Sequence, residues 1–286
     1  GQENQKLWVD KEKDGRSWGY FYLGTKDDVT CAQGDAAEMR AYFMKEGDLK
    51  QMRKSAEKRY AAFAQKLDMN SDFPQHLTAA FDGLYTMAYF GEDLRPYWNK
   101  DGKSSIEDLY KEVMAKCYAF DRQLMADAYL AGGKEYAELC ALAYRQSVSA
   151  FQMSEDSDGE LLYFTPQVGP VDEYYPASPL YLRYNPDLVK AMLNPFFYYS
   201  ESGKWGKPFP PHDLGGYPIV NGQTIGGDMP VEEAGNGLIM TAAIAKMEKN
   251  ASYAEKHWKT LTQWAEYLLE NGTDTGDQLT TDNFAG

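Results

Sequence analysis

Residues 209–240 read FPPHDLGGYPIVNGQTIGGDMPVEEAGNGLIM. The first part is a loop dense in Gly and Pro that carries His212 and Asp213 side by side. The last part is an apolar helix whose first turn holds Glu232 and Glu233. Loops longer than about 12–15 residues inside a compact domain are usually functional or disordered, and the aromatic, Met and Pro content argues against a solvated linker. We therefore interpret this stretch as a site-building loop that runs into a helix.

The composition is that of a soluble globular protein with one large domain or two small ones. The chain has 286 residues, of which 43% are apolar and 25% charged, and this length suffices for a core. Its net charge of −14 argues against a nucleic-acid or anionic-membrane partner. No apolar run approaches the roughly 18–20 residues of a membrane span. The 22 Tyr and 6 Trp suit either a surface that stacks on polar ligands or ordinary packing.

The apolar spacing predicts a mainly α fold. Residues 1–33 contain the best strand candidate, at 17–25, and we interpret this segment as the edge or remnant of a β-rich domain. From residue 34 to residue 286 the spacing is helical, with Gly132-Gly133 as a break and Pro195 as a kink or split. The predicted helices cover 48–68, 76–90, 105–117, 119–131, 134–153, 185–202, 231–249 and 252–270.

Successive helices of this size usually form a bundle, a solenoid or a toroid of helical hairpins. No repeat of 34–47 residues is visible, which disfavours the solenoid. Long loops between some of the helices favour the toroid. One of them, the Pro-rich stretch 168–182, carries Asp172 and Glu173 next to tyrosines, a composition typical of a polar-ligand cleft or of a simple turn.

Two pairs of neighbouring residues in 209–240 could act chemically. Glu232 and Glu233 could be plain helix-start carboxylates, since the helix dipole stabilises anions there. Three helix-disfavoured residues follow them at 235–237, which indicates close packing or the approach of a ligand. His212 with Asp213 could be an acid/base pair, an oriented donor, or a hydrogen-bonded pair that stabilises the loop.

Other common chemistries have no motif here. We find no nucleophile elbow, no plausible Cys–His pair, no phosphate-binding loop and no zinc spacing, and the acidic string 154–160 fails the EF-hand pattern and is predicted to be a turn. We therefore expect no metal and no cofactor. Arg145, on a predicted helix, could clamp a substrate carboxylate or tie down an acid of a loop.

Five strings of the chain resemble the glutaminase A family: YFGEDLRPYWNKDG, LAGGKEYAELCALAYRQSV, YYPASPLYLRYNPDLVKAMLNPFFYYSESGKW, PFPPHDLGGYPIVNGQ and MPVEEAGNGLIMTAAIA. The resemblance implies an (α/α)6 toroid of the six-hairpin glycosidase type, preceded by a β-rich domain. It assigns residues up to about 182 to a central region and those from about 183 to a C-terminal region, both long labelled as domains of unknown function. It also implies an exported protein, located in the periplasm, at the cell surface or outside the cell.

The sequence departs from the family pattern at two places. Between Phe164 and Val171 only TPQVGP remains of a longer family stretch, and the chain stops at TDNFAG where the family continues through further helices. Since eight or nine helices cannot close a ring of twelve, we expect the toroid to be incomplete and truncated at its C-terminus.

The activity implied by the resemblance is hydrolysis of the side-chain amide of L-glutamine to L-glutamate and ammonia. The expected acid/base groups are Glu232, Glu233 and Asp213, and the expected substrate-binding residues are His212, Arg145, Gln146, Asp172, Tyr175, Tyr217 and Asn236. Two alternatives stay open. One is a six-hairpin glycoside hydrolase, in which carboxyl groups about 5–5.5 Å apart indicate retention and about 6.5–9.5 Å inversion. The other is a non-catalytic module that binds a carbohydrate or peptide. The sequence does not assign an oligomeric state.

Overall fold

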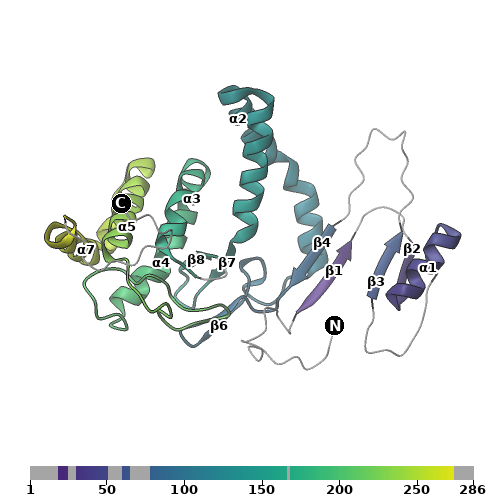
Figure 1. Ribbon diagram of the computed structural model, residues 1–286, viewed down its shortest axis with the longest axis horizontal. Helices are drawn as coiled ribbons and strands as arrows, with labels where there is room; N and C mark the ends of the chain where they lie inside the picture. The colour runs from purple at the N-terminus through teal and green to yellow at the C-terminus, as the bar shows by residue number, and fades with distance from the viewer. Residues whose placement is uncertain (1–18, 25–29, 51–59, 65–77, 166–167, 274–286) are drawn as a thin grey trace. The chain divides into compact units, whose positions relative to one another are not determined.

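A computed structural model describes residues 19–24, 30–50, 60–64, 78–165 and 168–273 of the chain, as shown in Figure 1. The chain divides into two compact units, residues 1–83 and residues 84–286. The described part is mainly helical, with short strands, and the longest strands lie in the first unit. The predicted fold class is therefore confirmed.

The described residues of the first unit form two antiparallel strand pairs and one helix. Strand β1 (Tyr20–Gly24) pairs with β4 (Thr78–Asp82), and β2 (Thr30–Gly34) pairs with β3 (Tyr60–Ala64). Helix α1 (Ala36–Glu46) begins after Asp35, whose carboxylate accepts hydrogen bonds from two backbone N–H groups of the first turn.

The structure corrects the helices predicted over 48–68 and 76–90. Residues 60–64, 78–82 and 87–89 are strands, and residues 51–59 and 65–77 lie outside the described part. The physical reason is pairing over a long distance: β1 and β4 stabilise each other although more than fifty residues separate them. Strand preference depends on such partners rather than on local spacing.

The second unit opens with a small sheet in the order β6-β5-β9. Strand β5 (Met87–Tyr89) pairs antiparallel with β6 (Glu92–Leu94) and parallel with β9 (Ile219–Val220). A 3₁₀ turn follows at Tyr97–Asn99. The sheet attaches the loop of 209–229 to a segment that lies about 130 residues earlier in the chain.

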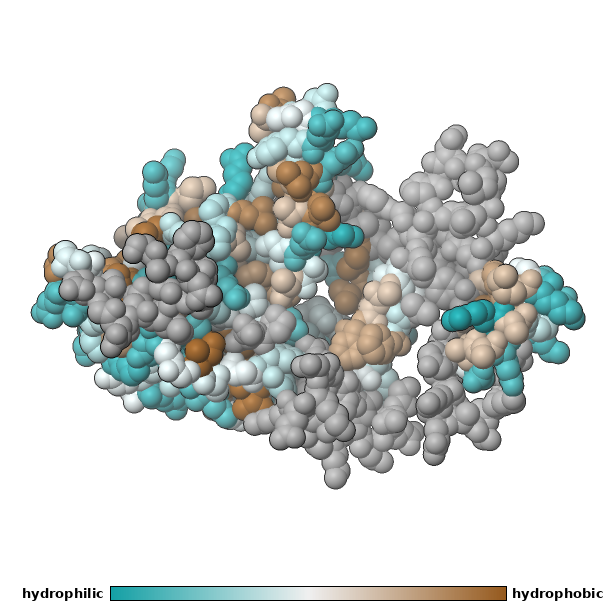
Figure 2. All heavy atoms as spheres, viewed as in Figure 1, coloured by the Kyte–Doolittle hydropathy of each residue, from teal (hydrophilic) through white to brown (hydrophobic). Residues whose placement is uncertain are grey.

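Helix α2 (Ile106–Ala150) begins after Ser105, whose hydroxyl accepts a hydrogen bond from the Asp108 N–H at 3.2 Å. Gly133 interrupts the helix with φ 77° and ψ −167°, so the predicted break at this position is confirmed. Several apolar side chains of α2 are exposed, and apolar residues appear at the surface over this helix in Figure 2; they include Val113, Leu130, Leu139 and Leu142.

A hairpin of β7 (Gln152–Glu155) and β8 (Leu161–Phe164) follows α2. Its turn is held by Asp156, whose Oδ1 accepts hydrogen bonds from the N–H groups of Asp158 and Glu160. The acidic string 154–160 is thus a hydrogen-bonded turn, as predicted.

Helix α3 (Val171–Tyr184) corrects the loop predicted in this region, because Asp172 and Glu173 lie in its first turn. The helix contains Pro176 and Pro179, the residues that argued against it. Its buried residues fall at 171, 174, 178 and 181, a helical spacing whose burial outweighs the cost of the two prolines.

The remaining helices agree with the sequence pattern. Helix α4 (Pro186–Glu201) begins after Asn185, and α5 (Pro230–Glu248) begins at a proline. The last predicted helix is divided at His257 into α6 (Ser252–Lys256) and α7 (Trp258–Asn271). Pro195 does not split α4: the helix runs through it, and Pro195 is buried together with most of one helix face.

The core of the second unit lies between β8 and the helices α3, α4, α5 and α7. Helices α3 and α5 pack side by side, and α5 packs in turn against α7, as seen in Figure 1. Phe197 of α4 stacks on His257 at 3.9 Å and on Trp264 of α7 at 5.1 Å between ring centroids. A Cβ atom at Gly237 would lie 2.9 Å from the Trp264 ring, so this glycine permits the close contact of α5 with α7. Close packing, one of the two interpretations of residues 235–237, thus applies to Gly237.

No helix in the described residues combines the length and the apolar character that a membrane crossing requires.

His257 makes the stability of this core depend on pH. Its ring is buried, and its Nδ1 lies 3.0 Å from Glu201 Oε1. Burial lowers the pKa of His257, and the charge of Lys256 adds to this effect. Glu201 and Glu160 raise the pKa but do not outweigh burial. A lowered pKa means that the unfolded chain takes up the proton first as the pH falls.

We predict that the contribution of His257 to the free energy of unfolding decreases as the pH falls below about 6.5, the ordinary histidine value. His257→Gln should flatten this dependence between pH 7.5 and 5.5, since glutamine does not titrate. Urea unfolding at several pH values measures the slope. Equal slopes for both proteins would contradict the prediction.

Candidate functional site

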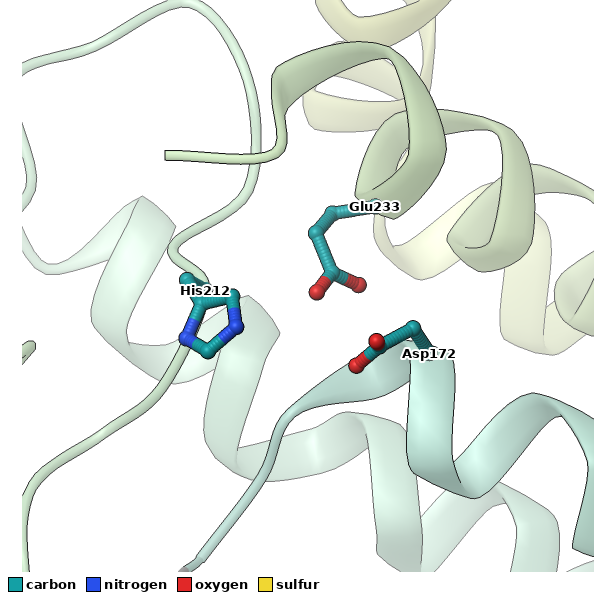
Figure 3. A group of neighbouring side chains, drawn as sticks. All are labelled: Asp172, His212 and Glu233. Atoms are coloured by element: carbon teal, nitrogen blue, oxygen red, sulfur yellow. The ribbon is translucent and has the colours of Figure 1, made fainter. Parts of the chain in front are cut away.

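Three side chains from three separate segments meet in the second unit. Asp172 comes from the first turn of α3, His212 from the loop after α4, and Glu233 from the first turn of α5. Figure 3 shows their polar ends facing one common space. One carboxylate oxygen or ring nitrogen from each lies within 4.8 Å of the others. We call this group the Asp172–His212–Glu233 cluster.

The Tyr174 hydroxyl holds the segment that precedes α3, and one backbone hydrogen bond joins this segment to the loop that carries His212. The Tyr174 hydroxyl accepts from the N–H groups of Thr165, at 3.1 Å, and Gly169, at 3.0 Å. The N–H of Leu214 donates to the carbonyl of Val168 at 3.1 Å. Gly169 has φ +118°, and a Cβ there would lie 3.1 Å from the ring of Phe196. These contacts bring Asp172 next to the segment that carries His212.

Asp213 organises the loop itself. Its Oδ1 accepts hydrogen bonds from the Gly215 N–H, the Thr224 N–H and the Thr224 hydroxyl at 2.9–3.0 Å, and its Oδ2 accepts from the Ile225 N–H at 3.1 Å. Burial alone would raise the pKa of this carboxyl, but the hydrogen bonds from His212, Thr224 and Ile225 lower it to about 2. Asp213 is therefore an ionised anchor of the loop.

His212 is fixed on two sides. Its Nδ1 lies 3.4 Å from Asp213 Oδ2, and its backbone N–H donates to Gln223 Oε1 at 2.8 Å. Gln223 in turn donates to the carbonyls of Ile225 and Gly227 and to Asp228. The ring is 1% exposed, and its Nε2 has no hydrogen-bond partner among the described residues. The loop-stabilising interpretation of the His212–Asp213 pair thus holds for Asp213, while His212 presents a nitrogen to the cluster.

Glu233 is the most unusual member of the cluster. It has no exposed surface, and neither of its carboxylate oxygens accepts a hydrogen bond of good geometry in the described part of the chain. Burial, together with the charges of Asp172 and Glu232, raises the pKa of Glu233 to about 10. A carboxyl in this position is stable at neutral pH either as the neutral acid or as an anion balanced by a cation.

The other predicted site residues lie outside this cluster and differ in their exposure to solvent. Glu232 is half-buried beside Glu233, and Asn236 is half-buried on the same helix. Tyr217 is half-buried in the loop, and Tyr175 is 38% exposed on α3. Arg145 and Gln146 are exposed on α2, with no hydrogen bond or ion pair to the cluster among the described residues. The acid/base role of Glu232 and the substrate-binding roles of the other residues stay predictions.

Gln223, Thr224 and Tyr174 were missed by the sequence analysis. Tyr174 and Gln223 accept hydrogen bonds from backbone N–H groups of the segments that carry Asp172 and His212. Thr224 donates from its N–H and its hydroxyl to the carboxylate of Asp213. Their polar side chains look ordinary in sequence, and only the position of Gln223 and Thr224 inside a long Gly-rich loop could have indicated a structural task.

Chemically, the cluster offers two carboxyl groups and one imidazole at short range. Such groups transfer protons to and from a reacting substrate. The same three groups are also common ligands of divalent metal ions. Asp172 is half-buried whereas the other two are buried, so Asp172 is the member nearest to solvent.

We predict that Asp213→Asn destabilises the protein by about 2–4 kcal/mol, because it removes a buried charge that accepts several hydrogen bonds. Urea unfolding measures the loss, and amide hydrogen exchange should accelerate at Thr224 and Ile225. Asp228→Asn is a matched control in the same loop, where a partly exposed pair with Lys207 should contribute at most about 1 kcal/mol. Equal effects of the two changes would be evidence against the anchoring role.

Two family models together match nearly the whole chain. The model described as the glutaminase A six helical-hairpin domain matches residues 133–286, just over half of the chain. A domain of unknown function (DUF5127) matches residues 1–127. The border between the two matches lies at the non-helical Gly133 of α2.

Two curated relatives bear glutaminase names. The chain is 26% identical over 317 residues to "Glutaminase A" of Aspergillus oryzae, an alignment that covers 98% of this chain and 45% of the relative. It is 23% identical over 364 residues to "Probable glutaminase" of Arthroderma benhamiae, with 96% and 42% covered. The chain thus spans less than half the length of these relatives. No solved structure matches it. The match to the six helical-hairpin model, over more than half of the residues, shows that the chain belongs to the glutaminase A family.

Proposed function

We propose that this chain carries reacting groups of a hydrolase that converts L-glutamine to L-glutamate and ammonia. Family membership and the names of the two relatives support the reaction class. The observation that carries the position of the site is the buried, unpaired carboxyl of Glu233 beside Asp172 and His212. We also propose a location outside the cytoplasm, which rests on the resemblance to an exported family.

Amide hydrolysis sets clear demands on such a site. A C–O bond forms between water and the amide carbon, the C–N bond breaks, and one proton passes from the water to the departing nitrogen. Carboxylate and imidazole groups perform such transfers and typically contribute 10²–10⁴-fold to the rate. Two carboxyl groups and one imidazole within 4.8 Å meet this demand without any other side chain.

We assign the contact with the attacking water to Asp172, because it is the cluster member with exposed surface. Glu233 and His212 lie behind it and set the charge at the reacting centre. Asp213 acts through His212, whose ring it orients, and we therefore treat it as a positioning residue. For Arg145, an exposed residue of α2, the role of a clamp for a substrate carboxylate stays a prediction.

A retaining glycoside hydrolase is the second candidate function. One carboxyl oxygen of Asp172 and one of Glu233 lie within 4.8 Å of each other, below the roughly 6.5–9.5 Å separation of inverting enzymes. Release of the aglycone from aryl glycosides, without ammonia release from glutamine, would favour this candidate.

We predict that Glu233→Gln in the full-length protein lowers kcat/KM for ammonia release from L-glutamine by about 100-fold or more, because the cluster loses a carboxyl group with little change of shape. A coupled ammonia assay measures it. Glu266→Gln, the same change at an exposed position of α7, is the control and should keep the parent rate. Persistence of full activity in Glu233→Gln would rule out this site for the reaction.

A further inference from the structure

We propose that Asp172, His212 and Glu233 bind one divalent transition-metal ion. Ion binding at this cluster goes beyond the proposed function, because it requires no substrate and can be measured without one. It also goes beyond the sequence, whose spacing predicted no metal.

The donor atoms already lie close to a coordinating arrangement. Each residue contributes one ligand atom, and all three lie within 4.8 Å of one another. Ligands at about 2.0–2.2 Å from a tetrahedral ion are about 3.4 Å apart, so side-chain adjustments of about 1 Å complete the arrangement. Figure 3 shows the carboxyl of Glu233 and the ring of His212 facing the carboxyl of Asp172.

A cation would balance the negative charge of the ionised carboxylates in the cluster. Glu233 is fully buried, and no Lys or Arg among the described residues forms an ion pair with it. Its two oxygens and His212 Nε2 lack hydrogen-bond partners in the described part of the chain and are nevertheless removed from solvent. Buried polar atoms without a partner cost free energy, and an ion bound by one oxygen of Glu233 and by His212 Nε2 would reduce this cost.

The surroundings prepare the ligands for this task. His212 Nδ1 contacts Asp213 Oδ2 at 3.4 Å, which leaves Nε2 as the free nitrogen. A carboxylate behind a ligand histidine is the usual outer contact in metal sites, where it fixes the ring orientation. Asp172 Oδ1 accepts the Glu173 N–H at 3.0 Å, which restrains the second carboxylate. The first-turn position of Asp172 and Glu233 fixes both backbones.

The ligand set indicates the class of ion. Two carboxylates and one imidazole, without a thiolate, suit Zn²⁺, Mn²⁺ or Fe²⁺, whereas Ca²⁺ prefers six to eight oxygen ligands. Three protein ligands leave at least one position for water, and a bound ion of this kind lowers the pKa of that water. This chemistry would serve the proposed hydrolysis directly.

The test uses the full-length protein dialysed against EDTA and titrated with Zn²⁺ and with Mn²⁺ in a calorimeter, with the bound metal counted by mass spectrometry. We expect one ion per chain, and at least 10-fold weaker binding in Glu233→Gln and in His212→Gln. Glu173→Gln, an exposed acid next to Asp172, is the matched control and should bind as the parent does. Circular dichroism verifies that each variant is folded.

Binding of Co²⁺ gives a second readout, since its visible absorption depends on the geometry and type of the ligands and should change in His212→Gln. Absence of stoichiometric binding, or binding unaltered in both cluster variants, would overturn the proposal. Ammonia release is measured separately on the same samples. Ion binding without ammonia release would refute the proposed function alone, and full release by the metal-free protein would refute a catalytic role of the ion alone.

Discussion

The buried carboxyl of Glu233 is the constraint on which the site depends. Its position is set by α5, which is packed between α3 and α7, with Gly237 against Trp264 on the side of α7. The helix cannot move the carboxyl into solvent without opening this packing. A buried carboxyl that lacks hydrogen bonds costs several kcal/mol unless it is neutral or paired with a cation. Such strongly perturbed groups gather at functional sites, which is why we locate the chemistry here.

In Asp213 and Glu233, the fold shifts the pKa values of two buried acids in opposite directions. Asp213 faces three backbone N–H groups, a hydroxyl and an imidazole, and these lower its pKa. Glu233 is fully buried beside Asp172 and Glu232, and burial together with the charges of these two acids raises its pKa. The carboxylate that is fully hydrogen-bonded holds the loop, and the one without partners remains free to interact with a ligand.

The sequence predicted the helices of the second unit well and the site only in part. Helices α2, α4 and α5 follow from caps and apolar spacing, which act within one segment. Strand β1 falls within the strand predicted at 17–25. Helix α3 was hidden by two prolines, and β3 and β4 by partners far away in sequence. For the site, His212 and Glu233 stood out by residue type and unusual neighbours. Their meeting with Asp172 depends on Tyr174, Val168 and Gln223, whose contacts join residues up to 46 positions apart and leave no recognisable pattern in the sequence.

Two partly buried acids of this chain are paired with lysines, and this comparison helps to interpret the Asp172–His212–Glu233 cluster. Glu248 pairs with Lys190, and Asp228 pairs with Lys207, although both acids are only partly buried. At Glu233, where burial is complete, no such lysine is supplied by the described residues. A permanent lysine would neutralise the acid and also occupy the space that Asp172, His212 and Glu233 face. A proton or a metal ion from solution could balance Glu233 and leave again, and such a reversible partner is what the proposed reacting centre requires.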